Sequence, residues 1–214
     1  NQNVWRWRQE VFELPQDWQT LRIKSSEIEF AWGPLGGGPA QDIAALELVV
    51  AAGPGGQGEI LVSDLRFEDT TYYLTPLVTA SSALRDCAPE HIFDSSPVTC
   101  WRSAAIDTPQ QVTIDFKAER EYGGLTIRWD QKRRPRAFDL LLSRDGKDWH
   151  SGFSTAQGVG NETHIYLPGT VSRFVRLDLQ ESMCGSGFGI IGIEVQPHGF
   201  SRSLNDFFSA IARR

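Results

Sequence analysis

The feature that most constrains the fold of this chain is the alternation of apolar and polar residues in short runs. In RFVRLDL, Val175, Leu177 and Leu179 fall on one side of an extended chain, and Arg176 and Asp178 fall on the other. A period of two residues is that of a β-strand with one buried face. The chain also has 20 glycines and 11 prolines, which interrupt these runs as turn residues do. The sequence therefore predicts an all-β protein.

Runs of this kind form two groups along the chain. The first group includes VWRWRQEVFEL, IEFAW, IAALELVVAA and GEILVSDLRFED, and the second includes QQVTIDF, LTIRWD, FDLLLS, THIYL, RFVRLDL and IGIEV. Six to eight short antiparallel strands separated by turns are typical of a β-sandwich or jelly roll. About seventy residues is a small size for an independent sandwich. We therefore expect two consecutive antiparallel β-sandwich units, 1–72 and 73–198, of which the first is incomplete.

The end of the chain, residues 199–214, has a different period. Ser203 and Asp206 have the spacing of a helix N-terminal capping box. The apolar residues that follow at the helical spacing i, i+3, i+4, i+7 are Leu204, Phe207, Phe208 and Ile211. We expect a short C-terminal amphipathic helix that leads to a further domain, because its apolar face would need a partner.

Charge and motifs argue against several functions. The net charge of −6 does not favour nucleic acid, although the basic run KRRPR at 132–136 is either a solvated loop or part of a binding site. No apolar run approaches the roughly 18 residues of a membrane span. The four histidines lie outside nucleophile motifs such as G-x-S-x-G, and no phosphate-binding glycine loop is present. An independent enzyme is therefore not indicated.

Three cysteines, Cys87, Cys100 and Cys184, allow at most one internal disulfide. Cys100 and Cys184 both lie in turn-like sequence, so a bridge between these two is conceivable. The sequence establishes neither the pairing nor the redox compartment.

One turn has the oxygen-rich composition of a cation site. In IFDSSPVTCWRS, Asp94, Ser96 and Thr99 can offer oxygens from one loop, and Glu194 on the polar face of the last strand could complete the shell if the first and last strands lie side by side. A hard cation such as calcium takes six to eight oxygen ligands. The alternative is an Asx-type turn with no metal.

The segment from about 77 to 197 resembles the discoidin, or F5/8 type C, domain. The matching pieces, in order, are TASSALRD, IFDSSPVTCWRS, QQVTIDF, GGLTIRWD, FDLLLSRDGKDW, RFVRLDL and GFGIIGIEV. The resemblance implies an eight-stranded jelly roll and, as in many bacterial members, a carbohydrate-binding module attached to a glycoside hydrolase. It also implies a structural calcium held by the side chains of Asp94 and Thr99, the carbonyl of Ser96, and Glu194.

Residues before the junction EDTTYYLTPL resemble the later strands of the galactose-binding-like jelly rolls that precede discoidin domains in large bacterial carbohydrate-active proteins. The matching pieces are DWQTLRIKSSEIEFAWGP and GEILVSDLRFED. This resemblance implies a fragment of a larger bacterial protein, secreted or periplasmic.

Sugar recognition in this family uses loops at one end of the sandwich and needs an aromatic face with a few polar groups. The candidate ligand-binding residues are Asp130, Lys132, Arg133 and Arg136 after Trp129, and Phe188 in SMCGSGFG. The alternative is that Phe188 only packs its turn, and Trp101, Trp129 and Trp149 are expected in the core.

The function expected from these residues is non-catalytic glycan binding beside an adjacent domain of the same polypeptide. The alternative is a structural spacer that orients a catalytic domain without binding sugar. Binding to lipid head groups is disfavoured, because no loop carries adjacent exposed large apolar residues.

Overall fold

The structure is a computed structural model of the 214-residue chain. It describes residues 3–10, 12–13, 15–34, 36–37, 40, 42–51, 58–67, 74–106, 108–201 and 203–213. The chain divides into two units, Asn1–Tyr72 and Tyr73–Arg214, and each is described by itself.

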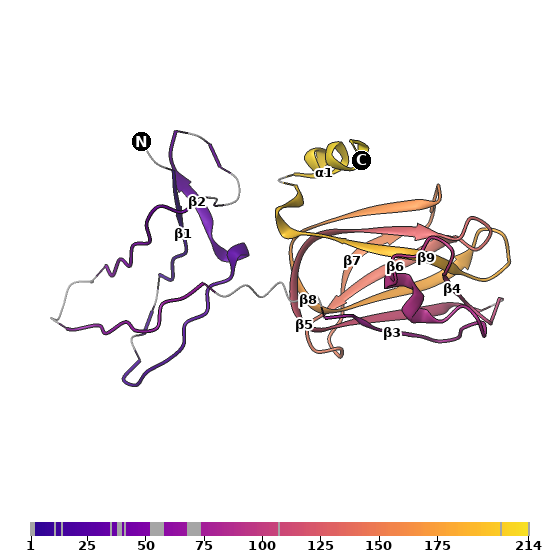
Figure 1. The fold of residues 1–214 in the computed structure, drawn as a ribbon, viewed down its shortest axis with the longest axis horizontal. Coiled ribbons are helices and arrows are strands. Elements are labelled where there is room, and N and C mark those ends of the chain that lie inside the picture. Colours follow the sequence, from indigo (N-terminus) through magenta and orange to yellow (C-terminus); the bar gives the residue numbers. More distant parts are fainter. Residues whose placement is uncertain are drawn as a thin grey trace. The chain divides into compact units, whose positions relative to one another are not determined.

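The first unit contains one small antiparallel ladder. Strand β1 (Val4–Arg6) pairs with β2 (Glu29–Trp32), and the 3₁₀ helix η1 (Ser25–Glu27) precedes β2 (Figure 1). The rings of Trp5 and Phe30 meet edge to face at 5.8 Å between centroids. This aromatic pair packs one side of the ladder.

The strands predicted within 42–51 and 58–67 are not formed in the structure. Their apolar side chains stay exposed, as Val49 at 81% and Phe67 at 79% show. A strand is stabilised only when a neighbour bonds its backbone N–H and C=O groups. Among the described residues no segment supplies that pairing, so the alternating pattern alone does not produce a sheet here.

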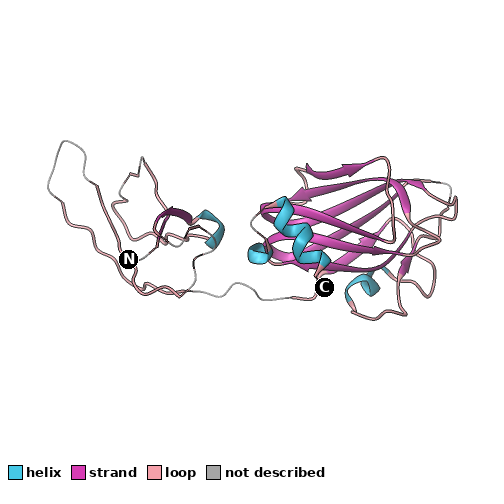
Figure 2. Cartoon of the chain, turned by 90° about the horizontal axis from the view of Figure 1, so that it is seen from above, coloured by secondary structure: helices cyan, strands magenta, loops and turns pink. Residues whose placement is uncertain are grey.

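Antiparallel strands form the body of the second unit, and loops and short helices surround them (Figure 2). They are β3 (Leu77–Ala80), β4 (Trp101–Arg102), β5 (Gln110–Trp129), β6 (Pro135–Ser143), β7 (His150–Thr155), β8 (Glu162–Ser182) and β9 (Gly189–Gln196). The all-β prediction is confirmed. The two long strands, β5 and β8, pair with each other along most of their length.

β5 and β8 connect the two layers of a sandwich. The first part of β5 lies between β3 and the end of β8, where β6 and β7 continue the layer. The last part of β5 lies between the start of β8 and β9, and β9 pairs with β4. The change of layer coincides with an irregularity after Asp115, where Lys117 has a φ of 65° and donates its N–H to Asp115 Oδ1 at 2.7 Å.

Alternate side chains of these strands fill the space between the layers. The core includes Ile92, Trp101, Val112, Ile114, Leu125, Ile127, Trp129, Phe138, Leu140, Val175, Leu177, Leu179 and Ile190. The expectation for Trp101 and Trp129 is confirmed. Trp149 is instead only half-buried. It follows a turn rather than lying on an inner face, and its ring packs against Phe174 and under the guanidinium of Arg176.

The predicted C-terminal helix forms as α1 (Leu204–Ala212), after the 3₁₀ helix η3 (His198–Phe200). Ser203 caps it by accepting the N–H of Asp206 at its hydroxyl oxygen, at 3.2 Å. None of the described helices is long and apolar enough to cross a membrane.

The apolar face of α1 is covered only in part by its own unit, and Leu204 on that face is 52% exposed. The expectation that this helix leads to a further domain stays a prediction. Phe207 is fully buried, and its ring lies 5.4 Å from that of Tyr166 and 5.5 Å from that of Phe200. Gly124 on β5 allows this approach, because a Cβ atom there would come within 2.7 Å of the Phe207 ring. Phe208 remains 47% exposed.

Candidate functional site

The candidate metal turn begins where the 3₁₀ helix η2 (Pro89–Phe93) ends. Asp94 caps the helix, and Ser95 takes a left-handed conformation with a φ of 59°. Asp94 Oδ1 accepts the N–H of Ser96 at 2.8 Å, and Oδ2 accepts the hydroxyl of Thr99 at 2.6 Å. The carboxylate therefore organises its own turn.

These hydrogen bonds also set the charge of the turn. The bond from Thr99, followed by that from the Ser96 backbone, lowers the pKa of Asp94 below its ordinary value. The side chain is exposed and stays ionised near neutral pH. A carboxylate held ionised beside hydroxyl and carbonyl oxygens is a donor set that a hard cation accepts.

Glu194 lies on β9, opposite Thr126 of β5. η2, which ends at the Asp94 turn, packs against β9, the strand that carries Glu194, and against β4. The first strand does not do so, because β3 pairs with β5 and not with β9. The assumption that the first and last strands lie side by side is therefore wrong, and β4 takes that place.

The described residues contain no group of three or more His, Cys, Asp and Glu placed to hold a metal. A cation at the turn would depend on Asp94, Thr99, backbone carbonyls and Glu194. This all-oxygen set fits calcium rather than zinc.

The candidate ligand loop, residues 130–134, joins β5 to β6 and is bonded to both neighbouring strands. Asp130 donates its N–H to the Gly189 carbonyl at 3.0 Å, and Gly189 donates back to the Arg133 carbonyl at 2.8 Å. Asp130 Oδ2 also accepts from Arg102 Nε at 2.7 Å. Most of the hydrogen-bonding capacity of Asp130 is thus used to shape the loop.

Three arginines of the basic run differ in their partners. Arg136 forms an exposed ion pair with Glu181 at 3.1 Å. Arg133 donates to the Ser103 carbonyl at 3.3 Å, and Arg134 donates to the Gly160 carbonyl at 3.4 Å and to the side chain of Asn161 at 3.3 Å. Within the described ranges, Arg133 and Arg134 contact only neutral acceptors. Their charges remain available to an anionic group.

Phe188 does not belong to a binding surface. Its side chain is 2% exposed and lies in the core, and its backbone N–H donates to the Ser103 hydroxyl at 2.9 Å. The prediction that Phe188 contacts ligand is therefore wrong. The alternative, that Phe188 only packs its turn, agrees with the structure, because Gly187 has a φ of 78° and fits closely against Ser103.

Three exposed apolar side chains beside the 130–134 loop were missed by the sequence analysis. Ile106 lies against Gly187, Met183 follows β8 and donates its N–H to the Arg134 carbonyl, and Val159 precedes the Gly160 carbonyl that Arg134 contacts. They come from three different loops, and no local sequence signal places them together. Arg102, on β4, was missed for the same reason, whereas Arg134 belongs to the basic run 132–136 but was not named among the candidate residues.

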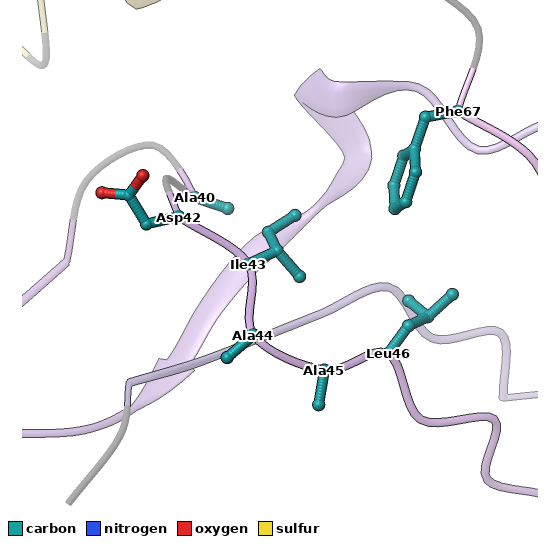
Figure 3. A pocket seen from close by; sticks show the side chains of 7 residues that line it. All are labelled: Ala40, Asp42, Ile43, Ala44, Ala45, Leu46 and Phe67. Carbon is teal, nitrogen blue, oxygen red and sulfur yellow. The ribbon is translucent and has the colours of Figure 1, made fainter.

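Two shallow depressions lie elsewhere. One is in the first unit and is lined by Ala40, Asp42, Ile43, Ala44, Ala45, Leu46 and Phe67 (Figure 3). Its lining is mostly apolar, and the carboxylate of Asp42 points away from Phe67. The other is in the second unit, where Gln111 already donates to Asp178 at 3.0 Å. Neither offers a cluster of unpaired polar groups.

The F5/8 type C domain model matches residues 78–192, more than half of the chain. The chain therefore belongs to the F5/8 type C domain family, and the resemblance noted in the sequence is confirmed. A search of curated proteins found no match.

Solved structures share the fold of the second unit. Chitosan-binding module 2 of a chitosanase/glucanase from Paenibacillus sp. IK-5, in complex with chitotriose, has a TM-score of 0.55 and 22% identity, over 58% of this chain and 98% of that one. The module CpGH89CBM32-5 of Clostridium perfringens, in complex with GalNAc-β-1,3-galactose, has a TM-score of 0.52 and 17% identity, over 57% and 95%. The family 32 module of NanJ from C. perfringens, in complex with galactose, has a TM-score of 0.52 and 12% identity, over 56% and 93%.

Proposed function

We propose that the second unit is a non-catalytic carbohydrate-binding module, which binds glycan through the loops beside residues 130–134. Family membership and the fold shared with modules solved in complex with sugars support this function. The module belongs to a larger bacterial carbohydrate-active protein that works outside the cytoplasm, next to another domain of the same polypeptide. A glycoside hydrolase is the parent that the similar modules favour.

The single observation that carries the proposal is that Arg133 and Arg134 have only neutral partners among the described residues. The two half-buried arginines belong to a loop that hydrogen bonds hold in place, and the described partners of their guanidinium groups are neutral. A guanidinium donates two parallel hydrogen bonds to a carboxylate or sulfate, which gives both affinity and orientation. We therefore propose that the module prefers acidic glycans.

The apolar side of a sugar ring would rest on aliphatic groups in this module. Trp101, Trp129 and Phe188 are buried, whereas Val159 is 78% exposed and Ile106 46%. Aliphatic side chains offer a weaker stacking surface than an aromatic ring. Affinity should therefore depend strongly on charge, and it should fall as salt screens the arginines.

Affinity electrophoresis of the full chain in gels containing polygalacturonate, galactan, dextran or chitosan tests the proposal. We expect retardation by polygalacturonate only. The double substitution R133A/R134A should weaken that retardation by about tenfold or more, the loss of one or two charge-assisted hydrogen bonds. R144A is the matched control, because Arg144 is an exposed arginine at the other end of β6.

The second candidate function is a spacer that orients a neighbouring domain without binding sugar. The observation that favours it is the internal bonding of Asp130 and Arg136, which leaves two of the candidate ligand residues occupied. Unretarded migration in all four polymers, with and without calcium, would support the spacer and overturn the binding module.

A further inference from the structure

Two of the three cysteines lie side by side in the structure. Cys100 Sγ is 4.0 Å from Cys87 Sγ, and both residues are free thiols. Cys100 is 8% exposed and Cys87 is half-buried. Cys184 is exposed in the loop after β8. Cys87 rather than Cys184 is therefore the neighbour of Cys100, which replaces the pairing considered from the sequence.

The backbone holds this pair together. Leu84 donates its N–H to the Arg102 carbonyl at 2.8 Å, and Arg102 donates to the Cys87 carbonyl at 3.3 Å. The segment 84–87 thus runs beside β4, and Cys100 directly precedes that strand. The proximity of the two sulfurs follows from backbone pairing rather than from the positions of mobile side chains.

The chain between the two cysteines forms a closed loop around a structured element. Residues 87–100 contain η2 and the Asp94 turn. Ile92 in the middle of this loop is 1% exposed, and His91 Nδ1 lies 3.4 Å from the Cys100 carbonyl oxygen. Both ends and the middle of the loop are therefore held in place by noncovalent contacts.

We propose that Cys87 and Cys100 form a disulfide within the domain when the protein meets a low-molecular-weight disulfide such as oxidised glutathione. The sulfurs must approach to about 2.05 Å, which rotation of the two side chains supplies while the backbone stays paired. The link would close the 87–100 loop and hold η2 against β4. This modification goes beyond the proposed glycan binding and does not depend on it.

The reaction balances by thiol–disulfide exchange. The half-buried Cys87 attacks oxidised glutathione as its thiolate, which forms a mixed disulfide and releases one glutathione thiolate. Cys100 then loses its proton and attacks the Cys87 sulfur, which releases the second glutathione. The two protein thiols are oxidised by two electrons, one glutathione disulfide is reduced to two thiols, and the two protein protons end on them.

The test uses the full chain carrying C184S, so that the exposed third thiol cannot react or link two molecules. After incubation with oxidised glutathione, we expect a denatured thiol assay to fall from two thiols to none. Peptide mapping should recover the 87 and 100 peptides joined, without bound glutathione. The midpoint of thermal unfolding, Tm, should rise by roughly 5–10 °C and return after reduction, because a closed loop restricts the unfolded chain.

The matched control is the double variant C87S/C184S, which replaces the more accessible partner and leaves the buried Cys100 in place. Its Tm should not respond to oxidised glutathione. The proposal is overturned if the C184S protein keeps both thiols, or if it accumulates glutathione on either cysteine without the internal bridge. Glycan retardation measured on the same samples reports the proposed function separately.

Discussion

Arg102 Nε lies 2.7 Å from Asp130 Oδ2, and this ion pair joins β4 to the loop between β5 and β6. The Asp130 side chain is 13% exposed, so the pair is partly shielded from water. Asp130 also bonds through its backbone to Gly189. One carboxylate therefore positions the loop that carries the candidate ligand-binding arginines.

The substitution D130N tests this positioning role. It keeps the shape of the side chain and removes the charge that Arg102 contacts. We expect the free energy of unfolding to fall by about 1–2 kcal/mol, since a hydrogen bond between charged groups is replaced by a weaker one. Urea unfolding followed by tryptophan fluorescence measures the change.

A control for D130N is E181Q, which removes the charge from the Arg136–Glu181 pair. Both side chains of that pair are more than half exposed, and exposed ion pairs contribute about 0–1 kcal/mol. E181Q should therefore change the unfolding free energy by less than about 0.5 kcal/mol. Equal losses in the two variants would contradict a positioning role for Asp130.

The docking of α1 gives a second prediction. Phe207 is fully buried against Tyr166 and Phe200, so F207A should lower the unfolding free energy by about 3–5 kcal/mol through lost burial and a cavity. F208A is the neighbouring control, because Phe208 is 47% exposed, and it should cost less than about 1 kcal/mol. Comparable urea midpoints for the two variants would show that the helix does not dock as described.

The helix illustrates what sequence periodicity determines. The spacing of Phe207 and Ile211, with Ser203 before them, correctly predicted a capped helix with one apolar face. It did not identify the surface that covers Phe207. Gly124, which makes room for Phe207, lies 83 positions earlier in the numbering, and local patterns carry no information about such a contact.

The difference between local sequence patterns and contacts between distant residues also explains which other predictions from the sequence were confirmed and which were wrong. Strands of the second unit were predictable because their alternation matches buried faces in a complete sandwich. The segments 42–51 and 58–67 alternate similarly but lack pairing partners among the described residues, so they form no strands. Phe188 and Trp149 were misplaced because a turn's direction depends on long-range bonds, such as the one from Phe188 N–H to Ser103.

Acid should weaken the junction between β5 and β8. Asp115 accepts two hydrogen bonds from Arg173, at 2.8 and 2.9 Å, and these lower the pKa of Asp115 below its ordinary value. A depressed pKa in the folded state stabilises the fold above the unfolded value, and that contribution is lost as pH falls through the folded pKa. Urea midpoints should therefore decrease below about pH 4.

Variants assign this acid sensitivity to the pair. D115N should reduce the slope of stability against pH in the acid range, because a side-chain amide does not titrate in that range. R173A should reduce this slope by a similar amount. The double variant D115N/R173A should reduce the slope by no more than the sum of the two single reductions. An unchanged acid slope in D115N would mean that other carboxylates govern the transition.

Calcium binding at the Asp94 turn gives the last prediction. If the oxygens of Asp94, Thr99 and Glu194 hold the ion, millimolar calcium should raise the Tm by a few degrees, and chelator should reverse the rise, since a ligand that binds only the folded state stabilises it. D94N should abolish the response. D145N is the matched control, because Asp145 likewise accepts backbone N–H groups in an exposed turn, at 2.8 and 2.9 Å, and it should retain the response. Equal melting curves with and without calcium would identify the Asp94 turn as a hydrogen-bonded turn without metal.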